Sequence, residues 1–356
     1  MSASEVIDPE RVKEFAKQLV SLYSGGGLTL MIDLGGRTGL FEALAEGPGT
    51  SDEIASRAGL KERPVREWLG SMAVAGIVMY DAATHLFTLP GEHAMCLTGD
   101  GAFNLAPMAQ LLGHSGKLIA KVAESFRTGA GVPYSEYRPE FTELADVIGR
   151  RRYDAMLVGG YLALAHGLPA RLEAGIRVAD VGCGSGHCIN LMAAAFPRST
   201  FVGYDIDKEG IARGHAEAEA MSLANTSFVA MDAGVLPPEP KCGLITAFDA
   251  IHDQTDPAGV LRRIREALAP DSIFFMLDIR ASSNLEDNVG KPTAPWIYTT
   301  SVMHCLQVSL AGGGAGLGAA WGEQKAREML TLAGFSRIET ARPPMDPFNL
   351  VYVCQP

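Results

Sequence analysis

The sequence lacks several features that would place it in a specialised class. None of its six cysteines forms a C-x-x-C pair, so neither a zinc ribbon nor a thioredoxin-type redox motif is present. No run of about 18 uncharged apolar residues occurs, which argues against a transmembrane helix. The opening segment, MSASEVIDPERVKEF, has neither the basic nor the apolar region of a signal peptide. We therefore expect a cytoplasmic protein with reduced thiols and no membrane partner.

Basic residues are also in short supply. Lysine and arginine number 30 against 41 aspartates and glutamates, which gives a net charge of −11. This negative net charge argues against sequence-independent electrostatic binding to nucleic acid or to an anionic membrane. Apolar residues make up 47% of the chain, which is ample for a buried core. At roughly 100–200 residues per domain, the 356 residues predict two domains with a linking segment.

The N-terminal quarter has the pattern of a winged helix-turn-helix. Apolar spacing predicts a helix over 10–23, a break at Gly25-Gly26-Gly27 and a second helix over 28–34. The segment from Thr38 to Pro90 then predicts helix, turn, helix, turn, helix and hairpin, with a helix cap at Thr50 or Ser51. We take the N-terminal domain as residues 1–95.

A winged helix can place its third helix in the major groove of DNA, or serve only for packing and dimerisation. The third-helix region has a net charge of only +1, from Lys61, Glu62, Arg63, Arg66 and Glu67. This weak charge favours dimerisation, and a DNA-binding role stays as the alternative.

The rest of the chain changes character twice. Residues 96–170 are expected to be mostly helical and to connect the domains. From Arg177, short apolar runs alternate with helices, which predicts a doubly wound, mostly parallel α/β sheet over 171–356. The segment GGGAGLG at 312–318 is expected to be a flexible loop.

One segment, VADVGCGSGHCINLMAAAFPRSTFVGYDID, carries the chemistry. A buried strand ends in the turn Gly182-Cys183-Gly184-Ser185-Gly186, a helix follows, and a second strand ends at Asp205. Glycines let a ligand approach the backbone closely, and an acidic residue at the second strand's tip can bind a ribose diol. The spacing G-x-G-x-G and the preceding Asp180 favour S-adenosylmethionine over the pyrophosphate of NAD, which leaves an NAD dehydrogenase as a weaker alternative.

These segments resemble the motifs of class I S-adenosylmethionine-dependent methyltransferases. VADVGCGSG resembles the first motif, GYDID the second, FVAMDAGVLP the third and LITAFDAIHD the fourth. The resemblance implies a Rossmann-like domain of seven strands with S-adenosylmethionine as cofactor. In that family Asp232 would bond the adenine amino group and Ala233 would offer its backbone amide. The implied cofactor-binding residues are Asp180, Gly182, Cys183, Gly184, Gly186, Asp205, Ile206, Asp232, Ala233 and Phe248.

With its winged helix, the chain resembles plant-type O-methyltransferases and other small-molecule methyltransferases whose substrates are unassigned. Members of that subgroup pair through the winged helix, so a homodimer is implied. AIHDQTDP resembles their H-D-W-[ST]-D segment, with Gln254 in place of the tryptophan. The resemblance implies that His252 is the general base, that Asp278 orients it, and that Glu323 is a weaker candidate for a second carboxylate; no metal is implied.

The sequence says least about the identity of the methyl acceptor. Aromatic and sulfur-containing side chains in the insertion before the last helix suit an apolar or aromatic small molecule. The candidate acceptor-binding residues are Tyr134, Trp296, Met303, His304 and Trp321, with Tyr298 and Tyr23 as further possibilities. O-methylation is expected, while an N-, S- or C-acceptor stays open. The alternative function is a winged-helix transcriptional regulator whose second domain senses S-adenosylmethionine.

Overall fold

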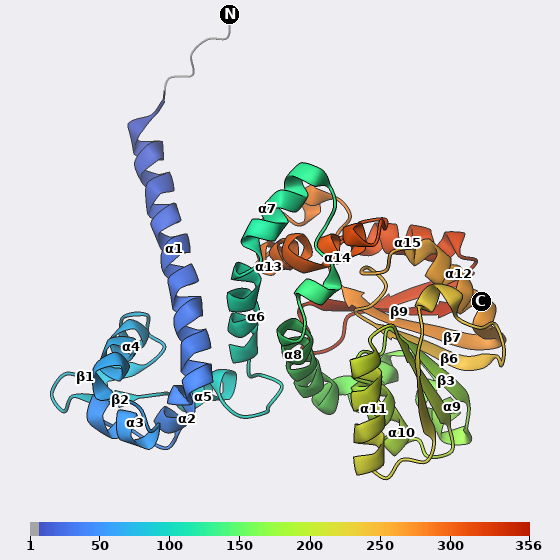
Figure 1. Ribbon diagram of the computed structural model, residues 1–356, viewed down its shortest axis with the longest axis horizontal. Helices are drawn as coiled ribbons and strands as arrows, with labels where there is room; N and C mark the ends of the chain where they lie inside the picture. Colours follow the sequence, from blue (N-terminus) through green and yellow to red (C-terminus); the bar gives the residue numbers. More distant parts are fainter. Residues whose placement is uncertain (1–6) are drawn as a thin grey trace, which may run out of the picture. The chain divides into compact units, whose positions relative to one another are not determined.

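The computed structural model describes residues 7–356 and divides after Gly116 into two units, which we describe separately (Figure 1). The predicted boundaries after residues 95 and 170 stay predictions. The expected lack of a signal peptide rests partly on residues 1–6, which lie outside the described residues. Among residues 7–356, no helix combines the length and apolar character needed to cross a bilayer.

The N-terminal unit has the predicted order of a winged helix-turn-helix. Its elements are α1 (Pro9–Thr38), α2 (Leu40–Ala45), α3 (Ser51–Arg57), α4 (Glu62–Val74), β1 (Met79–Asp81), β2 (Leu86–Thr88), α5 (Gly91–Leu97) and α6 (Ala106–Gly116). Thr50 caps α3 in a capping box with Glu53. The strands β1 and β2 pair antiparallel as the wing. The helices enclose a small core that includes Phe41, Trp68 and Met72.

The predicted break at Gly25-Gly26-Gly27 is wrong, because α1 runs through it as one helix of 30 residues. None of the three glycines has a positive φ. A glycine costs a helix about 1 kcal/mol relative to alanine, which weakens the helix without forbidding it. The helix beyond the glycines is fixed by tertiary contacts, since Met31 packs on the core and accepts a hydrogen bond from Trp68 Nε1 at 2.8 Å. Packing thus outweighs local propensity here.

The C-terminal unit begins with helices and continues into a seven-stranded sheet. The first helices are α7 (Ile119–Thr128), α8 (Glu140–Met156) and α9 (Leu168–Ala174), with a π-helical turn at Leu157–Tyr161. The strands are β3 (Arg177–Val181), β4 (Thr200–Asp205), β5 (Thr226–Ala230), β6 (Cys242–Phe248), β7 (Leu268–Ile279), β8 (Arg337–Ala341) and β9 (Asn349–Gln355).

The strands lie in the order β5-β4-β3-β6-β7-β9-β8. Neighbours among the first five are parallel, and β9 runs antiparallel to both β7 and β8. The chain leaves β3 toward β4 on one side and returns to β6 on the other. This change of direction opens a crevice at the carboxyl ends of β3 and β6, where open α/β sheets bind ligands. The predicted fold class is therefore confirmed.

Helices cover both faces of the sheet, as the alternation of side chains requires. In β7, Phe275 and Leu277 pack with α10 (His187–Ala195) and α11 (Lys208–Ala220), whereas Phe274 and Met276 pack with α12 (Pro257–Ala267) and α15 (Gly322–Leu332) (Figure 1). Between β7 and α15 lies an insertion with α13 (Ala294–Thr300), a π-helical stretch (Ser301–Cys305) and α14 (Leu306–Ala311). The glycine-rich segment 312–318 forms a loop, as predicted.

Candidate functional site

The glycine loop lies at the carboxyl end of β3. The amides of Gly182 and Cys183 both donate to the carbonyl of Tyr204, at 2.9 and 3.1 Å, which bends the chain sharply toward α10. Gly182, Gly184 and Gly186 have φ values of 73°, 54° and 74°, which only glycine adopts without strain. A Cβ on Gly182 would lie 2.5 Å from the Cβ of Ala250, whereas a Cβ on Gly184 would meet nothing within 4 Å. The loop is thus packed at its start and open at its middle.

Asp205 stands beside the open part of the loop, at the tip of β4. Its two carboxylate oxygens accept from the amides of Gly184 at 2.8 Å and Asp207 at 2.7 Å. Burial raises the pKa of Asp205 above its ordinary value, and the two amide hydrogen bonds oppose that rise. The next side chain, Ile206, is 71% exposed, which is unusual for isoleucine at the end of a buried strand. A carboxylate and an exposed apolar side chain therefore share one strand tip.

Asp180 lies beneath the loop and out of reach of solvent. It is 1% exposed and accepts a hydrogen bond from Thr246 Oγ1 at 2.7 Å. Burial raises its pKa to about 7, against the lowering effect of Thr246, and the nearby charge of Asp205 adds to the rise. Asp180 thus ties β3 to β6 directly below the crevice.

The predicted third motif follows β5 and returns to Asp205. The amide of Met231 donates to the Asp205 carbonyl at 2.8 Å, and the Asp232 carboxylate caps the turn at Gly234 with a hydrogen bond of 2.7 Å. Val235 in this turn is 64% exposed. At the end of β6, the ring of Phe248 is nearly buried and packs on Tyr153 at 5.5 Å. The predicted cofactor residues therefore lie at the carboxyl ends of β3, β4, β5 and β6.

His252 and Asp278 form a buried pair. His252 follows β6 by a few residues, and Asp278 lies near the end of β7. The Nδ1 atom of His252 lies 2.7 Å from Asp278 Oδ1, and the two residues are 3% and 0% exposed. Asp278 Oδ1 also accepts from Trp321 Nε1 at 3.1 Å. Because a carboxylate only accepts, Nδ1 carries a proton, and in the neutral ring the lone pair lies on Nε2.

Asp253 and Cys305 surround the Nε2 atom of His252. Asp253 Oδ1 lies 3.4 Å from Nε2, and Cys305 Sγ lies within 4.8 Å of both atoms. Burial alone would lower the pKa of His252, but the charges of Asp278 and Asp253 outweigh burial and raise it well above the usual value. Burial raises the pKa of the Cys305 thiol to about 12, and Asp253 reinforces this.

The second carboxylate near His252 is therefore Asp253 and not Glu323. The structure pairs Glu323 with Arg327 at 2.8 Å and Thr340 at 3.3 Å. Asp253 does have a signal in the sequence, since it directly follows His252 in the fourth motif. Cys305 has none, because only the folding of the π-helical stretch over the end of β6 brings it there.

The predicted acceptor-binding residues fall into separate groups. Tyr134, Met303 and His304 come together: the His304 ring stacks on Phe141 at 3.7 Å, and Tyr134 stands edge-on to it at 6.1 Å. The Met303 carbonyl accepts from the hydroxyl of Tyr137 at 2.6 Å. Burial raises the pKa of Tyr134, and the negative charge of Asp205 adds to the rise, while the hydroxyl of Tyr134 lies 3.2 Å from Thr142 Oγ1.

The two tryptophans lie elsewhere. Trp296 packs in a small apolar cluster with Ile297 and Cys305, and Trp321 is buried under Asp278. Tyr23 belongs to the N-terminal unit, where its side chain on α1 is 71% exposed.

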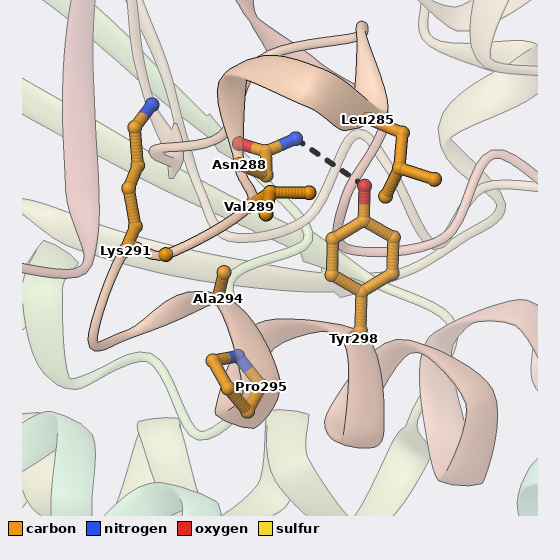
Figure 2. Close-up of a pocket in the computed structure, with 8 residues that line it drawn as sticks. Leu285, Asn288, Val289, Lys291, Ala294, Pro295 and Tyr298 are labelled. Carbon is orange, nitrogen blue, oxygen red and sulfur yellow. Dashed lines mark hydrogen bonds between the residues drawn. The ribbon is translucent and has the colours of Figure 1, made fainter. Parts of the chain in front are cut away.

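The insertion also forms a pocket of about 430 Å³ that the sequence analysis did not single out (Figure 2). Tyr298 extends from α13 into this pocket, and its hydroxyl accepts from Asn288 Nδ2 at 3.2 Å. Asn288 is itself buried at 3% exposure. The remaining lining is mostly apolar: Leu285, Val289, Gly290, Lys291, Ala294 and Pro295.

Two charged networks hold α8 against the crevice, and neither was predicted. Arg150 and His187 both contact Glu217, with His187 Nδ1 at 2.9 Å, and Asn190 donates to Glu217 at 2.9 Å. Burial opposes ionisation of Glu217, but these hydrogen bonds together lower its pKa to about 2.

In the second network, Arg152 donates to Asp249 at 2.8 Å and to Asn349 at 2.6 Å. Asp249 has a φ of 51°, a strained conformation for a residue with a side chain. Arg152 therefore fixes the backbone directly after β6, three residues before His252.

Comparison with known proteins agrees with this geometry. Residues 26–99 match the model of an Rv2258c-like winged helix-turn-helix domain, and residues 172–334 match the model of a methyltransferase domain. The chain carries a winged helix-turn-helix domain and a methyltransferase domain. The predicted enzyme class is thereby confirmed.

Two relatives share part of the methyltransferase's sequence. A trans-aconitate 2-methyltransferase of Methylobacterium nodulans is 29% identical over 116 residues, covering 33% of this chain and 42% of that protein. A ubiquinone biosynthesis O-methyltransferase of Aeromonas salmonicida is 28% identical over 158 residues, covering 41% of this chain and 64% of that protein. The chain thus matches less than two thirds of the length of either relative.

Two solved structures share the fold along the whole chain. The mitomycin 7-O-methyltransferase has a TM-score of 0.74 at 19% identity, with 98% of this chain and 100% of that chain covered. Human N-acetylserotonin methyltransferase, in complex with S-adenosylmethionine, has a TM-score of 0.74 at 15% identity, with 100% and 99% covered. At such identities the likeness is one of fold alone.

Proposed function

We propose that this methyltransferase transfers a methyl group to a hydroxyl oxygen of a small apolar or aromatic acceptor, with His252 as the proton acceptor. The observation that carries the proposal is the buried contact of 2.7 Å between His252 and Asp278. Ala250, two residues before His252, packs against the start of the glycine loop, so the loop and the proposed base belong to one crevice.

The residues around the crevice fit the cofactor. The middle of the glycine loop is open, Asp205 offers a carboxylate at a strand tip, and the apolar Ile206 and Val235 are exposed where an adenine would cover them. We assign Asp205 to the ribose hydroxyls and Asp232 with the Ala233 amide to the adenine. When bound, S-adenosylmethionine supplies a methyl group on a positively charged sulfur, which leaves as a neutral thioether.

His252 is placed to take the acceptor's proton. With Nδ1 donating to Asp278, the Nε2 lone pair of the neutral ring can accept the hydroxyl proton as the oxygen attacks the methyl carbon, and because the pKa of His252 is raised, the share of neutral ring grows as pH rises. Asp278 stabilises the imidazolium that results, and Trp321 holds Asp278 in place. Much of the remaining rate comes from holding donor and acceptor in line.

The acceptor class follows from the side chains nearby. Tyr134, Met303 and His304 form an aromatic and apolar group, of which Tyr134 is close enough to Asp205 to be affected by its charge, and such a group suits a flat or apolar molecule better than a polymer. The relatives named above include O-methyltransferases, which supports oxygen as the acceptor atom.

A homodimer and a cytoplasmic location complete the proposal. The first half of α1 exposes Val12, Phe15, Leu22 and Tyr23, each more than half accessible, which supports burial against a second copy. All six cysteines are free thiols, which fits a reducing compartment.

The winged helix is assigned to dimerisation and not to DNA. On α4, Arg63 pairs with Glu67 and Arg66 pairs with Glu62, so each arginine of this helix has an acidic side chain beside it, which weakens the attraction of this helix for phosphate. A gel-shift series at rising salt tests this, because DNA binding must weaken steeply as salt rises. A salt-sensitive complex would favour the regulator instead.

The decisive experiment combines an acceptor screen with one variant. Phenols, catechols, thiols and small carboxylic acids are offered with a labelled methyl donor, and binding of S-adenosylhomocysteine is measured by calorimetry. His252→Ala should lower turnover at least about 100-fold and leave S-adenosylhomocysteine affinity within about twofold. His166→Ala, at an exposed histidine, is the matched control and should change neither. Equal turnover in His252→Ala would remove the histidine from the mechanism.

A further inference from the structure

The proposed catalytic histidine and two neighbouring side chains have the chemistry of metal ligands. His252 Nε2, the Asp253 carboxylate and Cys305 Sγ all lie within 4.8 Å of one another. Imidazole, carboxylate and thiolate together are the ligand types of Zn²⁺, whereas Mg²⁺ prefers oxygen alone. His252 and Cys305 are 3% and 5% exposed, and the Asp253 side chain is 28% exposed, which leaves an approach from solvent.

The histidine is already held as a metal-ligating histidine is. Its Nδ1 donates to the buried Asp278, so that Nε2, which carries the lone pair in the neutral ring, faces Asp253 and Cys305. Histidines that bind metals almost always donate their other ring N–H to a carboxylate or carbonyl, which fixes the ring and raises its basicity. Asp278 is fixed in turn by Trp321 Nε1 and by the amide of Ile279.

The spacing fits a tetrahedral ion. With metal–nitrogen and metal–oxygen bonds of about 2.0–2.1 Å, two ligand atoms on a tetrahedral ion stand about 3.3–3.4 Å apart. Asp253 Oδ1 lies 3.4 Å from Nε2, too far for a strong hydrogen bond. This oxygen is buried and accepts no hydrogen bond of regular geometry from the described residues. The polar neighbours of the Asp253 carboxylate are His252 Nε2 and the Cys305 thiol, and a shared cation would give this carboxylate a stronger partner.

We propose that His252, Asp253 and Cys305 form a binding site for one Zn²⁺ ion per chain, with the fourth position open. On binding, the Cys305 thiol gives its proton to the buffer and becomes a thiolate ligand, and the proton on Nε2 of the charged His252 ring is released to the buffer as well. The sequence analysis expected no metal here, because Cys305 lies 52 positions after Asp253 and enters the site only through the fold of the insertion.

The consequence for catalysis rests on the proposed function. A cation on Nε2 occupies the lone pair that would accept the hydroxyl proton. Bound zinc and base catalysis by His252 therefore exclude each other, and zinc inhibits methyl transfer. The catalytic histidine would then respond to free zinc without any separate regulatory domain.

The experiment uses the full chain after chelator treatment and dialysis. Zn²⁺ alone is titrated by calorimetry, and Co²⁺ is added separately to look for the near-ultraviolet thiolate-to-cobalt charge-transfer band. The parent should bind one Zn²⁺ and show the band, and Mg²⁺ should give no heat. Cys305→Ser should weaken Zn²⁺ binding at least about 100-fold and abolish the band. Cys242→Ser, at a buried cysteine elsewhere, is the matched control and should behave like the parent.

A second variant guards against misfolding. Asp253→Asn keeps the shape of the side chain and should weaken Zn²⁺ binding at least about tenfold, with thermal unfolding of both metal-free variants confirming the fold. No Zn²⁺ binding by the parent, or unchanged binding in both variants, would overturn the site. Methyl transfer is assayed separately: activity without metal that zinc suppresses supports both proposals. Activity that requires zinc would keep the metal site and remove His252 as the base.

Discussion

If Asp205 binds the cofactor's ribose, replacing it should lower cofactor affinity strongly and change the stability of the protein little. We consider Asp205→Asn, which keeps the size of the side chain and removes its charge. In the structure the carboxylate accepts the amides of Gly184 and Asp207, one on each oxygen. A carboxylate offers about four acceptor positions, so about two are left for a ribose diol.

The expected loss of affinity follows from those two positions. A hydrogen bond to a charged group contributes about 1.5–3 kcal/mol, and the asparagine retains one weaker acceptor and turns its other atom into a donor. The net loss is therefore about 2–3 kcal/mol, or roughly 30- to 150-fold in the dissociation constant for S-adenosylhomocysteine.

The expected change in stability is much smaller. Burial raises the pKa of Asp205, which means that the folded protein pays to keep this carboxylate ionised. Removing the charge relieves that cost, while the lost hydrogen bond from Gly184 costs about 1 kcal/mol. The two effects nearly offset, so the free energy of unfolding should change by less than about 1 kcal/mol.

Calorimetry with S-adenosylhomocysteine and urea unfolding of the free protein measure the two quantities. Asp207→Asn is the control, because Asp207 caps α11 and pairs with Arg138 at 2.7 Å. It should lower stability and leave S-adenosylhomocysteine affinity within about threefold. The reasoning is refuted if Asp205→Asn binds like the parent, or if its stability falls as far as its binding energy.

Three further changes test other parts of the site. Asp278→Asn should lower kcat at least about 100-fold with little change in KM, because Asp278 acts through His252; steady-state kinetics measures this, and a rise in KM alone would contradict it. Glu217→Gln should cost about 2 kcal/mol of unfolding free energy at pH 7. The pKa of Glu217 is about 2 in the folded protein and 4.5 in its ordinary state. The ionised side chain therefore stabilises the fold fully above pH 4.5, and this stabilisation is lost as pH falls from 4.5 toward 2. Denaturant unfolding at several pH values should show the difference in unfolding free energy between parent and variant vanish over this range. Gly186→Ala should destabilise by about 2–4 kcal/mol in urea, because φ is 74° and the new Cβ would lie 2.3 Å from a ring carbon of Phe228; a fully stable variant would show that the turn is not as tight as described.

The sequence was sufficient wherever function depends on local spacing. The glycine loop and Asp205 lie within 25 residues of one another, and their order along the chain already implies a strand, a turn, a helix and a strand tip. The sheet follows from the alternation of strands and helices. Local spacing failed at Gly25-Gly26-Gly27, where contacts made by Trp68 from another helix keep α1 continuous.

The surroundings of His252 could not be read in the same way. Asp278 was reached through a family resemblance, but Cys305 and Arg152 stand far away in sequence, and no period or motif connects them to His252. Their positions follow from how the insertion and α8 pack over the ends of the strands. Glu323 carries the negative charge expected of a second carboxylate, but it pairs with Arg327 on the same helix and not with His252.

The neighbours of His252 determine whether its free ring nitrogen takes up a proton or binds a cation. One ring nitrogen is fixed by Asp278, so the chemistry rests on the other, Nε2. Asp253 makes that nitrogen more basic and, with Cys305, also offers a cation two further ligands. Replacing Cys305 alone would leave the proton acceptor intact and remove a soft ligand. If the active site responds to zinc through this cysteine, Cys305→Ser should keep its own metal-free rate of methylation at zinc concentrations that stop the parent. Equal sensitivity of the two proteins would show that zinc acts elsewhere.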